Sequence, residues 1–292
     1  MGNKNLCKAQ KVKNDEFYTQ LTDIEKELKH YSDHFKNKIV FCNCNDPEES
    51  NFWKYFELNF VKLGIKKLIS THYEKDKPSY KLEISGDINN DGVIDKLDII
   101  KTPLKQNGDF RSEECIEILN QCDIVVTNPP FSLMKEYIPL MVNSGKKFLI
   151  IAPLNSITYQ NIFPYIKNNK IWIGYTTPKI FTQPDKTTKA FGNIIWVTNI
   201  DIKKRHEKII LYKKYNELDY PKYDNYDAIE VSQTKNIPID YDGHMGVPIS
   251  FLCKHNPNQF EIIRFRIGND NKDLKYGSTY PFQRIIIKHK QS

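Results

Sequence analysis

The sequence predicts an α/β fold built around a doubly wound, mostly parallel sheet. The first observation is that short β-branched runs alternate with amphipathic stretches as far as about residue 200. The second is a change of texture after Asp201, where short β-like runs lie among Pro, Asn, Asp and many Tyr residues. We therefore expect a core domain over residues 1–200 and an irregular appended region over residues 201–292.

The first half of the expected core contains two strands and two helices. Residues 38–42 and 65–70 are short apolar runs rich in β-branched side chains, which predict two buried strands. Between them, residues 50–63 carry five aromatic side chains and predict one helix with a largely buried face. Ser112 precedes a run with acids in its first turn, so residues 112–120 predict a helix capped by that serine.

The second half of the expected core continues the alternation. Residues 123–127 predict a buried strand, 133–142 a helix, 147–151 a strand and 155–166 a helix. Residues 171–175 and 193–198 predict two further strands with only a loop, 176–191, between them. Because no helix separates these last strands, we expect an antiparallel hairpin at the sheet edge. In the appended region, residues 208–212, 260–267 and 284–288 are the β-like runs.

Composition limits the class of protein without identifying it. The net charge is +7 and the pI about 8.8, which permits a polyanionic partner without requiring one. The six cysteines form no C-x-x-C pair and no zinc spacing, so we expect free thiols in the reducing cytoplasm and no metal site. No apolar run is long enough for a signal peptide or a membrane span.

The tetrapeptide Asn128-Pro129-Pro130-Phe131 follows the predicted strand 123–127. Ligands of open α/β sheets bind beyond the carboxyl ends of the strands, which is where this tetrapeptide is expected. Such a sequence suits an enzyme that methylates an amino nitrogen. The exocyclic amine of adenine is a poor nucleophile, because its lone pair is delocalised into the ring. The alternative is a rigid turn at a strand end, with Phe131 in the core.

Each residue of the tetrapeptide has an expected role. The side-chain oxygen of Asn128 and the main-chain carbonyl of Pro129 can accept the two hydrogens of the amine and stabilise the positive charge that develops on it. Pro130 restricts Pro129 to extended conformations. Phe131 offers a flat face on which a planar base can stack.

Two segments are candidates for binding the two ends of a nucleoside cofactor. Asp109 and Phe110 stand at a loop tip before the predicted strand 123–127. In that position Asp109 can accept a hydrogen bond from an adenine amine, and Phe110 can cover the adenine ring. The alternative there is a surface turn made by Asn-Gly-Asp. Asn45, Asp46 and Pro47 follow the first strand, and Asp46 can pair with an ammonium group.

Further candidates surround these two segments. Glu74 follows the second strand, where a carboxylate can bind ribose hydroxyls, although Tyr73 could pack on the cofactor instead. Phe17, Tyr18 and Thr19 precede the first helix, which is expected between them and the strand 38–42, and they could fold over the cofactor; a helix cap with a hydrophobic anchor explains them nearly as well.

Aromatic and basic residues later in the chain are candidates for binding the substrate. Phe191 ends the 176–191 loop and could stack on a flipped base opposite Phe131, with Phe181 as the competitor for that role. Lys203, Lys204 and Arg205 are candidates for phosphate contacts, against the alternative of a solvated surface.

Residues 87–98 place oxygen ligands at the spacing of a calcium-binding loop, with glycine at the sixth position. The twelfth position is Asp, and the loop occurs once inside an α/β core. A polar connecting loop is therefore the preferred interpretation. A calcium-stabilised binding module remains the alternative from another functional class.

The assembled motifs resemble the EcoRI-type family of adenine-specific DNA methyltransferases across nearly the whole chain. The resemblance rests on residues 15–20, 42–47, 108–112, 124–132, 189–193 and 246–252. It implies a Rossmann-like, seven-stranded methyltransferase sheet with an appended target-recognition region. It also implies S-adenosylmethionine as the cofactor and methyl transfer to N6 of a flipped adenine in double-stranded DNA.

The resemblance further implies a restriction-modification context, with a GAATTC-like site and a cognate restriction endonuclease sharing that site. It places Asn128, Pro129 and Phe131 in the catalytic pocket, Asp109 and Phe110 on the cofactor adenine, and Asp46 near its methionine end. The glycine expected in the first cofactor loop is absent. The rival enzyme is a methyltransferase for an amino or amide nitrogen of RNA or protein, because similar motifs serve both chemistries.

Overall fold

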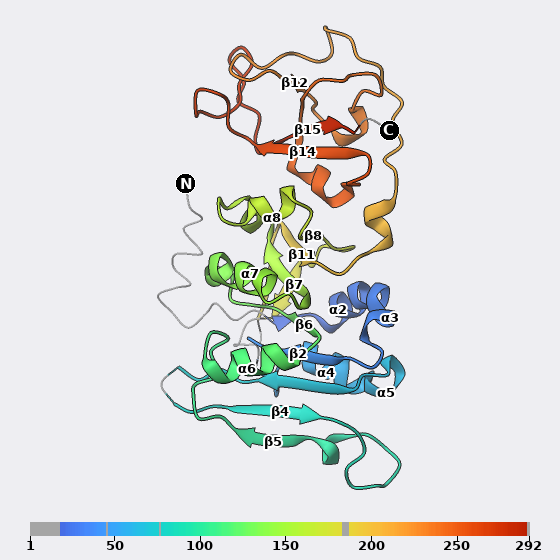
Figure 1. The fold of residues 1–292 in the computed structure, drawn as a ribbon, viewed down its shortest axis with the longest axis vertical. Helices are drawn as coiled ribbons and strands as arrows, with labels where there is room; N and C mark the ends of the chain where they lie inside the picture. Colours follow the sequence, from blue (N-terminus) through green and yellow to red (C-terminus); the bar gives the residue numbers. More distant parts are fainter. Residues whose placement is uncertain (1–17, 45, 76, 183–186, 291–292) are drawn as a thin grey trace. The chain divides into compact units, whose positions relative to one another are not determined.

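The computed structural model describes residues 18–44, 46–75, 77–182 and 187–290, and the chain forms two compact units (Figure 1). Residues 1–162 and 173–200 make up the first unit, and residues 163–172 and 201–292 the second. No helix in the described part of the chain combines the length and apolar character needed to cross a bilayer.

The first unit is built on a large mixed sheet. Its strands run in the order β5 (Ile100–Pro103), β4 (Tyr80–Ile84), β3 (Lys67–Thr71), β2 (Ile39–Cys42), β6 (Ile124–Thr127), β7 (Lys147–Pro153), β11 (Ile194–Thr198) and β8 (Trp172–Ile173). The four strands β3, β2, β6 and β7 are parallel neighbours at the centre, which confirms the α/β class. β4, β5 and β11 are antiparallel to their neighbours.

The sheet has eight strands where seven were expected. The β4–β5 hairpin at one edge was missed, because residues 100–103 alternate too little to indicate a strand and are all at least partly exposed (Figure 1). Residues 85–99 join these two strands, and they include residues 87–98, which have the spacing of a calcium-binding loop. The expected strand 171–175 is reduced to the two residues of β8.

The helices of the first unit, for which no range was predicted over residues 21–35, follow the predicted order from residue 50 onward with two corrections. They are α2 (Leu21–Leu28), the 3₁₀ turn η1 (Lys29–Tyr31), α3 (Ser32–Phe35), α4 (Asn51–Leu58), α5 (Phe60–Leu63), α6 (Glu113–Gln121) and α7 (Met134–Asn143). The helix expected over 50–63 is two helices, interrupted at Asn59, whose side chain donates to the Tyr55 carbonyl. Ser112 caps α6 as predicted, accepting from the Cys115 amide.

The helix expected over 155–166 is also interrupted. Residues 154–158 form the 3₁₀ turn η4 (Leu154–Thr158), and Tyr159 then adopts an extended conformation with ψ 142°. The α-helix that follows, α8 (Phe163–Lys167), belongs to the second unit. Thr158 contributes to the break, since its hydroxyl bonds the Asn155 carbonyl and closes the short turn.

The segment expected as a plain loop over 176–191 contains two strands. β9 (Ile180–Thr182) pairs with β10 (Thr188–Ala190) and with β1 (Tyr18–Thr19), both antiparallel. Thr19 stands opposite Phe181, and Lys189 stands opposite Phe181 on the other side. The small sheet therefore ties the start of the described chain to the segment that carries Phe181 and Phe191.

The second unit contains a sheet in the order β12 (Ile229–Glu230), β13 (Met245–Pro248), β15 (Arg284–His289) and β14 (Phe260–Phe265). The β-like runs predicted over 260–267 and 284–288 are thus confirmed. The 3₁₀ turns η5 (Lys203–His206), η6 (Thr234–Asn236) and η7 (Ile249–Lys254) lie in the connections. Buried Glu230 and partly buried Arg284 form an ion pair at 2.6 Å.

The run 208–212 is not a strand, which corrects the prediction. The side chain of Gln259 occupies both backbone groups of Ile209, accepting from its amide at 2.8 Å and donating to its carbonyl at 2.9 Å. Ile210 beside it is 86% exposed. A side-chain amide therefore takes the place that a neighbouring strand would fill.

His255 is expected to make the stability of the second unit depend on pH. Burial lowers its pKa from 6.5 to about 4, although its Nε2–H donates to the Phe260 carbonyl at 3.1 Å. Between these two pKa values the His255 imidazole binds a proton in the unfolded chain but not in the folded chain. The free energy of unfolding therefore falls as pH drops from about 7 towards 4. By pH 5 this single group is expected to remove about 2 kcal/mol.

Urea unfolding at pH 7 and pH 5 checks this expectation. His255→Gln keeps a donor for the Phe260 carbonyl but does not titrate. The variant is expected to lose less stability between the two pH values than the wild type does. Equal losses in both proteins would show that other groups carry the pH dependence.

Candidate active site at the carboxyl edge of the sheet

The central parallel strands bring the predicted segments to one edge of the sheet. Cys42 stands opposite Ser70, Phe41 opposite Val125, and Thr127 opposite Ile150, so β2, β3 and β6 end close together while β7 continues to Pro153. Residues 43–47, 72–74 and 128–131 follow three of these strands directly. The order of the strands thus assembles segments that are far apart in the sequence.

The tetrapeptide 128–131 follows β6 where it was expected. Asn128 is 6% exposed and Phe131 is 5% exposed. The Leu133 amide donates to the Pro130 carbonyl at 3.0 Å, so the 3₁₀ turn η3 (Phe131–Leu133) begins at once and leads into α7. Asn128 is therefore buried in the short connection between β6 and α7.

Three phenylalanines form a row beside the tetrapeptide. The rings of Phe131 and Phe181 meet edge to face, with centroids 6.4 Å apart, and Phe181 meets Phe191 in the same way at 5.6 Å. Phe181 is fully buried, whereas Phe191 is partly exposed and lies under the ammonium group of Lys189. A base stacked between two rings needs parallel ring planes, so it does not fit between Phe131 and Phe181 as they stand.

The Asp109–Phe110 segment lies against the residues that follow β3. The Glu74 amide donates to the Asn107 carbonyl at 2.9 Å, which places partly exposed Glu74 beside this loop. Gly108 has φ +77°, and a Cβ atom there would stand 1.8 Å from the carbonyl oxygen of His72. Glycine at 108 is thus required by the close approach of two backbone segments.

Asp109 is engaged by a neighbouring arginine. Arg111 donates from Nε to Oδ1 at 2.9 Å and from Nη2 to Oδ2 at 2.8 Å. Burial raises the pKa of the Asp109 carboxyl, but the hydrogen bonds and charge of Arg111 outweigh it and leave the pKa below its usual value. The carboxylate stays ionised and keeps lone pairs for a further donor. Phe110 is 5% exposed and lies under the Arg111 guanidinium.

Asp46 has partners that the sequence did not indicate. Its Oδ1 accepts from the Glu48 amide at 2.9 Å and from the Tyr80 hydroxyl at 3.3 Å, and its Oδ2 lies 3.7 Å from His72 Nε2. The His72 and Tyr80 rings are stacked, with centroids 4.9 Å apart. His72 follows β3 directly and was detectable by that position; Tyr80 lies on the unexpected β4.

Of the remaining cofactor candidates, the structure describes three and leaves out two. Phe17 and Asn45 lie outside the described residues, and Pro47 is buried. Tyr18 and Thr19 form β1, where the Thr19 carbonyl accepts from the Asn51 side chain at 2.7 Å. These contacts join the start of the described chain to α4, directly after the 43–47 segment.

Glu27 is a further residue that sequence analysis missed. It is fully buried on α2 and accepts from the Tyr31 hydroxyl, the Tyr175 amide, and both the amide and hydroxyl of Thr176, at 2.7–2.8 Å. The carboxylate anchors the chain just before β9 and β10. The available signal was a charged residue that shares one helix face with Ile24 and Leu28.

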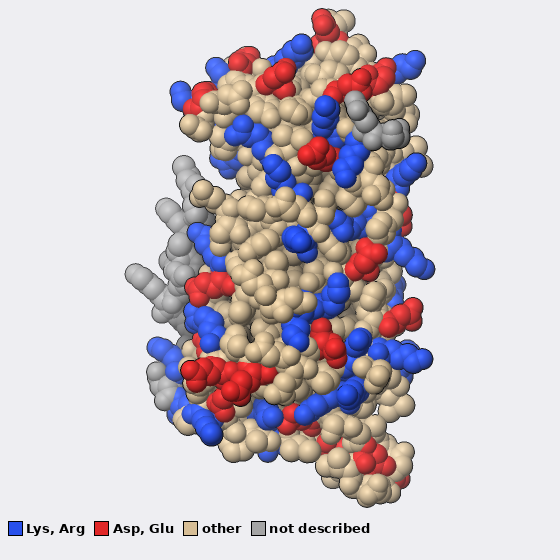
Figure 2. Space-filling model, in the orientation of Figure 1, with Lys and Arg blue, Asp and Glu red and all other residues tan. Residues whose placement is uncertain are grey.

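The basic residues 203–205 lie in η5 of the second unit. Lys203 is exposed, but Arg205 packs its guanidinium 3.8 Å from the Trp172 ring centroid and donates to Asn169 at 2.7 Å. Burial lowers the Arg205 pKa. Basic and acidic side chains are interspersed over the face shown in Figure 2.

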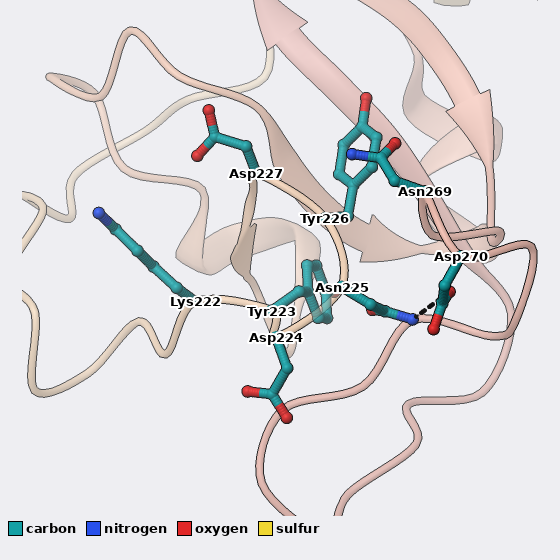
Figure 3. Close-up of a pocket in the computed structure, with 8 residues that line it drawn as sticks. All are labelled: Lys222, Tyr223, Asp224, Asn225, Tyr226, Asp227, Asn269 and Asp270. Carbon is teal, nitrogen blue, oxygen red and sulfur yellow. Dashed lines mark hydrogen bonds between the residues drawn. The ribbon is translucent and has the colours of Figure 1, made fainter.

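Two other features stand apart from the predicted site. Within the described residues, no group of three or more His, Cys, Asp or Glu side chains is placed to hold a metal ion. The carboxylates of Asp87, Asp91, Asp95 and Asp98 instead accept from backbone amides of their own loop. A cavity of about 660 Å³ lies in the second unit, lined by 222–227 and 269–270, where Asn225 donates to Asp270 (Figure 3).

Comparison with known proteins identifies the family. The family model described as "Adenine-specific methyltransferase EcoRI" matches residues 5–291. The chain is 47% identical to Type II methyltransferase M.EcoRI of Escherichia coli, over 99% of this chain and 97% of the relative. It is 40% identical to M.MgeORF184P of Mycoplasma genitalium and 39% identical to M.MpnI of Mycoplasma pneumoniae, in each case over 88% of this chain and 84% of the relative. No solved structure matches significantly. A match of this extent shows that the chain belongs to the EcoRI family of adenine-specific methyltransferases.

Proposed function

We propose that the chain is an S-adenosylmethionine-dependent DNA methyltransferase that modifies N6 of adenine at a specific site, in a restriction-modification context. The observation that carries this proposal is the placement of Asn128-Pro129-Pro130-Phe131 at the end of a buried central strand, beside the segments that follow β2 and β3. Membership of the adenine-specific family supports the same conclusion.

The residues at the sheet edge fit the chemistry of S-adenosylmethionine. A carboxylate, Asp46, stands after β2 for the ammonium group, and a second, Asp109, stands beside Phe110 for the adenine. Glu74, whose amide bonds the Asn107 carbonyl, is the carboxylate proposed for the ribose hydroxyls. The cofactor supplies an electrophilic methyl group on a sulfonium sulfur.

The protein contributes acceptors and exclusion of water. Asn128 Oδ1 and the Pro129 carbonyl accept the two hydrogens of the adenine amine, which localises the nitrogen lone pair and stabilises the positive charge formed during transfer. The product ammonium is acidic and loses its proton to water, so the pocket needs no general base. Phe131 borders the base. Because Phe181 meets Phe131 edge to face, partly exposed Phe191 is the better candidate for stacking on the base.

We assign recognition of double-stranded DNA to residues 201–292. Lys203 and Lys204 are proposed phosphate contacts, whereas the packing of Arg205 on Trp172 gives that residue a structural role. The enzyme would act in the cytoplasm, and a restriction endonuclease would share its site without needing to touch it.

Methyl transfer from labelled S-adenosylmethionine to genomic DNA tests the proposal. We expect N6-methyladenine, mapped by sequencing, within one short motif, and a GAATTC duplex is the first synthetic substrate to compare with a scrambled duplex. Label in RNA or in a protein amide, with none in DNA, would favour the rival methyltransferase. Calcium-dependent stability without cofactor binding would favour a binding module.

A further inference from the structure

The side chains of Tyr137 and Asn43 form a hydrogen bond that no sequence pattern indicated. The Tyr137 hydroxyl, on α7, donates to Asn43 Oδ1 at 2.6 Å. Tyr137 is fully buried and Asn43 is 1% exposed. Burial raises the pKa of the Tyr137 hydroxyl well above its usual value, so it remains a donor throughout the working range of pH.

Each partner of this bond is attached to a different part of the active site. Asn43 begins the segment that leads to Asp46, and its main-chain carbonyl accepts from the hydroxyl of Thr127, the residue before Asn128. Tyr137 stands on the helix that follows the tetrapeptide, and its ring meets Phe110 edge to face, with centroids 5.0 Å apart. One buried pair therefore contacts the 43–47, 107–110 and 127–131 segments.

The backbone beyond Asn43 needs such a restraint. Cys44 has φ 66°, in the left-handed region that a residue with a side chain adopts at a cost. A conformation of this kind persists when the surrounding contacts hold it. The Tyr137 hydroxyl contacts this segment at two points, because it donates to Asn43 one residue earlier and also lies within hydrogen-bonding reach of the Cys44 thiol.

We propose that Tyr137 and Asn43 are positioning residues that set the methionine end of the cofactor site against the target-adenine site. This inference rests on the proposed function. Methyl transfer needs the acceptor nitrogen and the methyl carbon in line at close range, and a small displacement of one segment against the other lowers the rate. The pair touches neither reactant; it acts through Asp46, Phe110 and Asn128.

Tyr137→Phe removes the hydroxyl and keeps the ring against Phe110. Loss of one buried hydrogen bond is expected to raise the Kd for S-adenosylmethionine roughly fivefold to tenfold. The Kd is measured by calorimetry without DNA, so the result does not depend on activity. We also expect a fall in kcat with the KM for DNA unchanged, since the DNA contacts assigned to residues 201–292 are untouched.

A double-mutant cycle separates positioning from general stability. Asn43→Ala removes the acceptor side chain but leaves the main-chain carbonyl that Thr127 uses. If both residues act through their shared hydrogen bond, Tyr137→Phe will raise the cofactor Kd less in the Asn43→Ala background, where only the contact of the hydroxyl with Cys44 is left to lose, than in the wild type. Additive effects on Kd would overturn the inference, as would a normal Kd in Tyr137→Phe.

The matched control is Tyr223→Phe, which removes another buried tyrosine hydroxyl bonded to a side chain, that of Glu230 in the second unit. It is expected to lower the unfolding midpoint without changing the cofactor Kd. If Tyr223→Phe raised the cofactor Kd as much as Tyr137→Phe does, the effect of Tyr137→Phe would come from a loss of overall stability and the inference would fail. Failure of the wild type to bind S-adenosylmethionine would instead overturn the proposed function.

Discussion

Asn128→Ala is expected to lower kcat for adenine methylation by roughly 10²–10³-fold, which is the usual effect of removing one group that stabilises charge in a transition state. The side-chain oxygen is one of only two acceptors proposed for the amine hydrogens. Because the cofactor candidates lie on other segments, binding of S-adenosylmethionine is expected to be largely retained. Single-turnover methylation of a duplex substrate, together with calorimetry of cofactor binding, measures both quantities.

Asn59→Ala is the matched control for Asn128→Ala. Asn59 is also an asparagine of the first unit, but it lies between α4 and α5 and donates to the Tyr55 carbonyl. Its loss is expected to lower stability modestly and to leave kcat unchanged. Robust methylation by Asn128→Ala would contradict the acceptor role. If Asn128→Ala also lost cofactor binding, Asn128 would instead be needed for the structure of the carboxyl edge of the sheet.

The sequence was most informative where a structure is determined locally. Within the predicted run 123–127, residues 124–127 are all β-branched, and they form the buried strand β6. Ser112 with two acids after it caps α6, because a short polar side chain accepts from the first free amides of a helix. The parallel order of the central strands then brings the segments after β2, β3 and β6 together without further information.

The contacts that hold these segments depend on long-range geometry. Asn43 and Tyr137 are separated by 94 positions, and neither is unusual within its own neighbourhood. The Gln259 side chain occupies the backbone of Ile209 over 50 positions and so removes a predicted strand. Residues 100–103 pair with β4 although their own pattern is weak. Such pairings are decided by which segments the finished fold brings within hydrogen-bonding distance.

Gly108→Ala is expected to destabilise the first unit by more than about 4 kcal/mol, at the upper end of single-residue effects. The added Cβ would stand 1.8 Å from the His72 carbonyl oxygen, which belongs to backbone and cannot rotate away. Moving the loop would break the bonds from the Glu74 amide to Asn107 and from the Ser79 amide to Gln106. Asp109 and Phe110 would move with it, so cofactor affinity is expected to fall as well.

Gly145→Ala isolates the steric part of this effect. Gly145 has φ +70°, close to the +77° of Gly108, but no atom lies within 4 Å of a Cβ built there. The variant bears only the backbone cost of the left-handed region, about 1–2 kcal/mol. Urea unfolding of the two variants therefore gives a difference that comes from the His72 contact alone. Equal stabilities would mean that the 107–110 loop can leave His72 freely, and the close approach of these segments would then have no part in shaping the cofactor site.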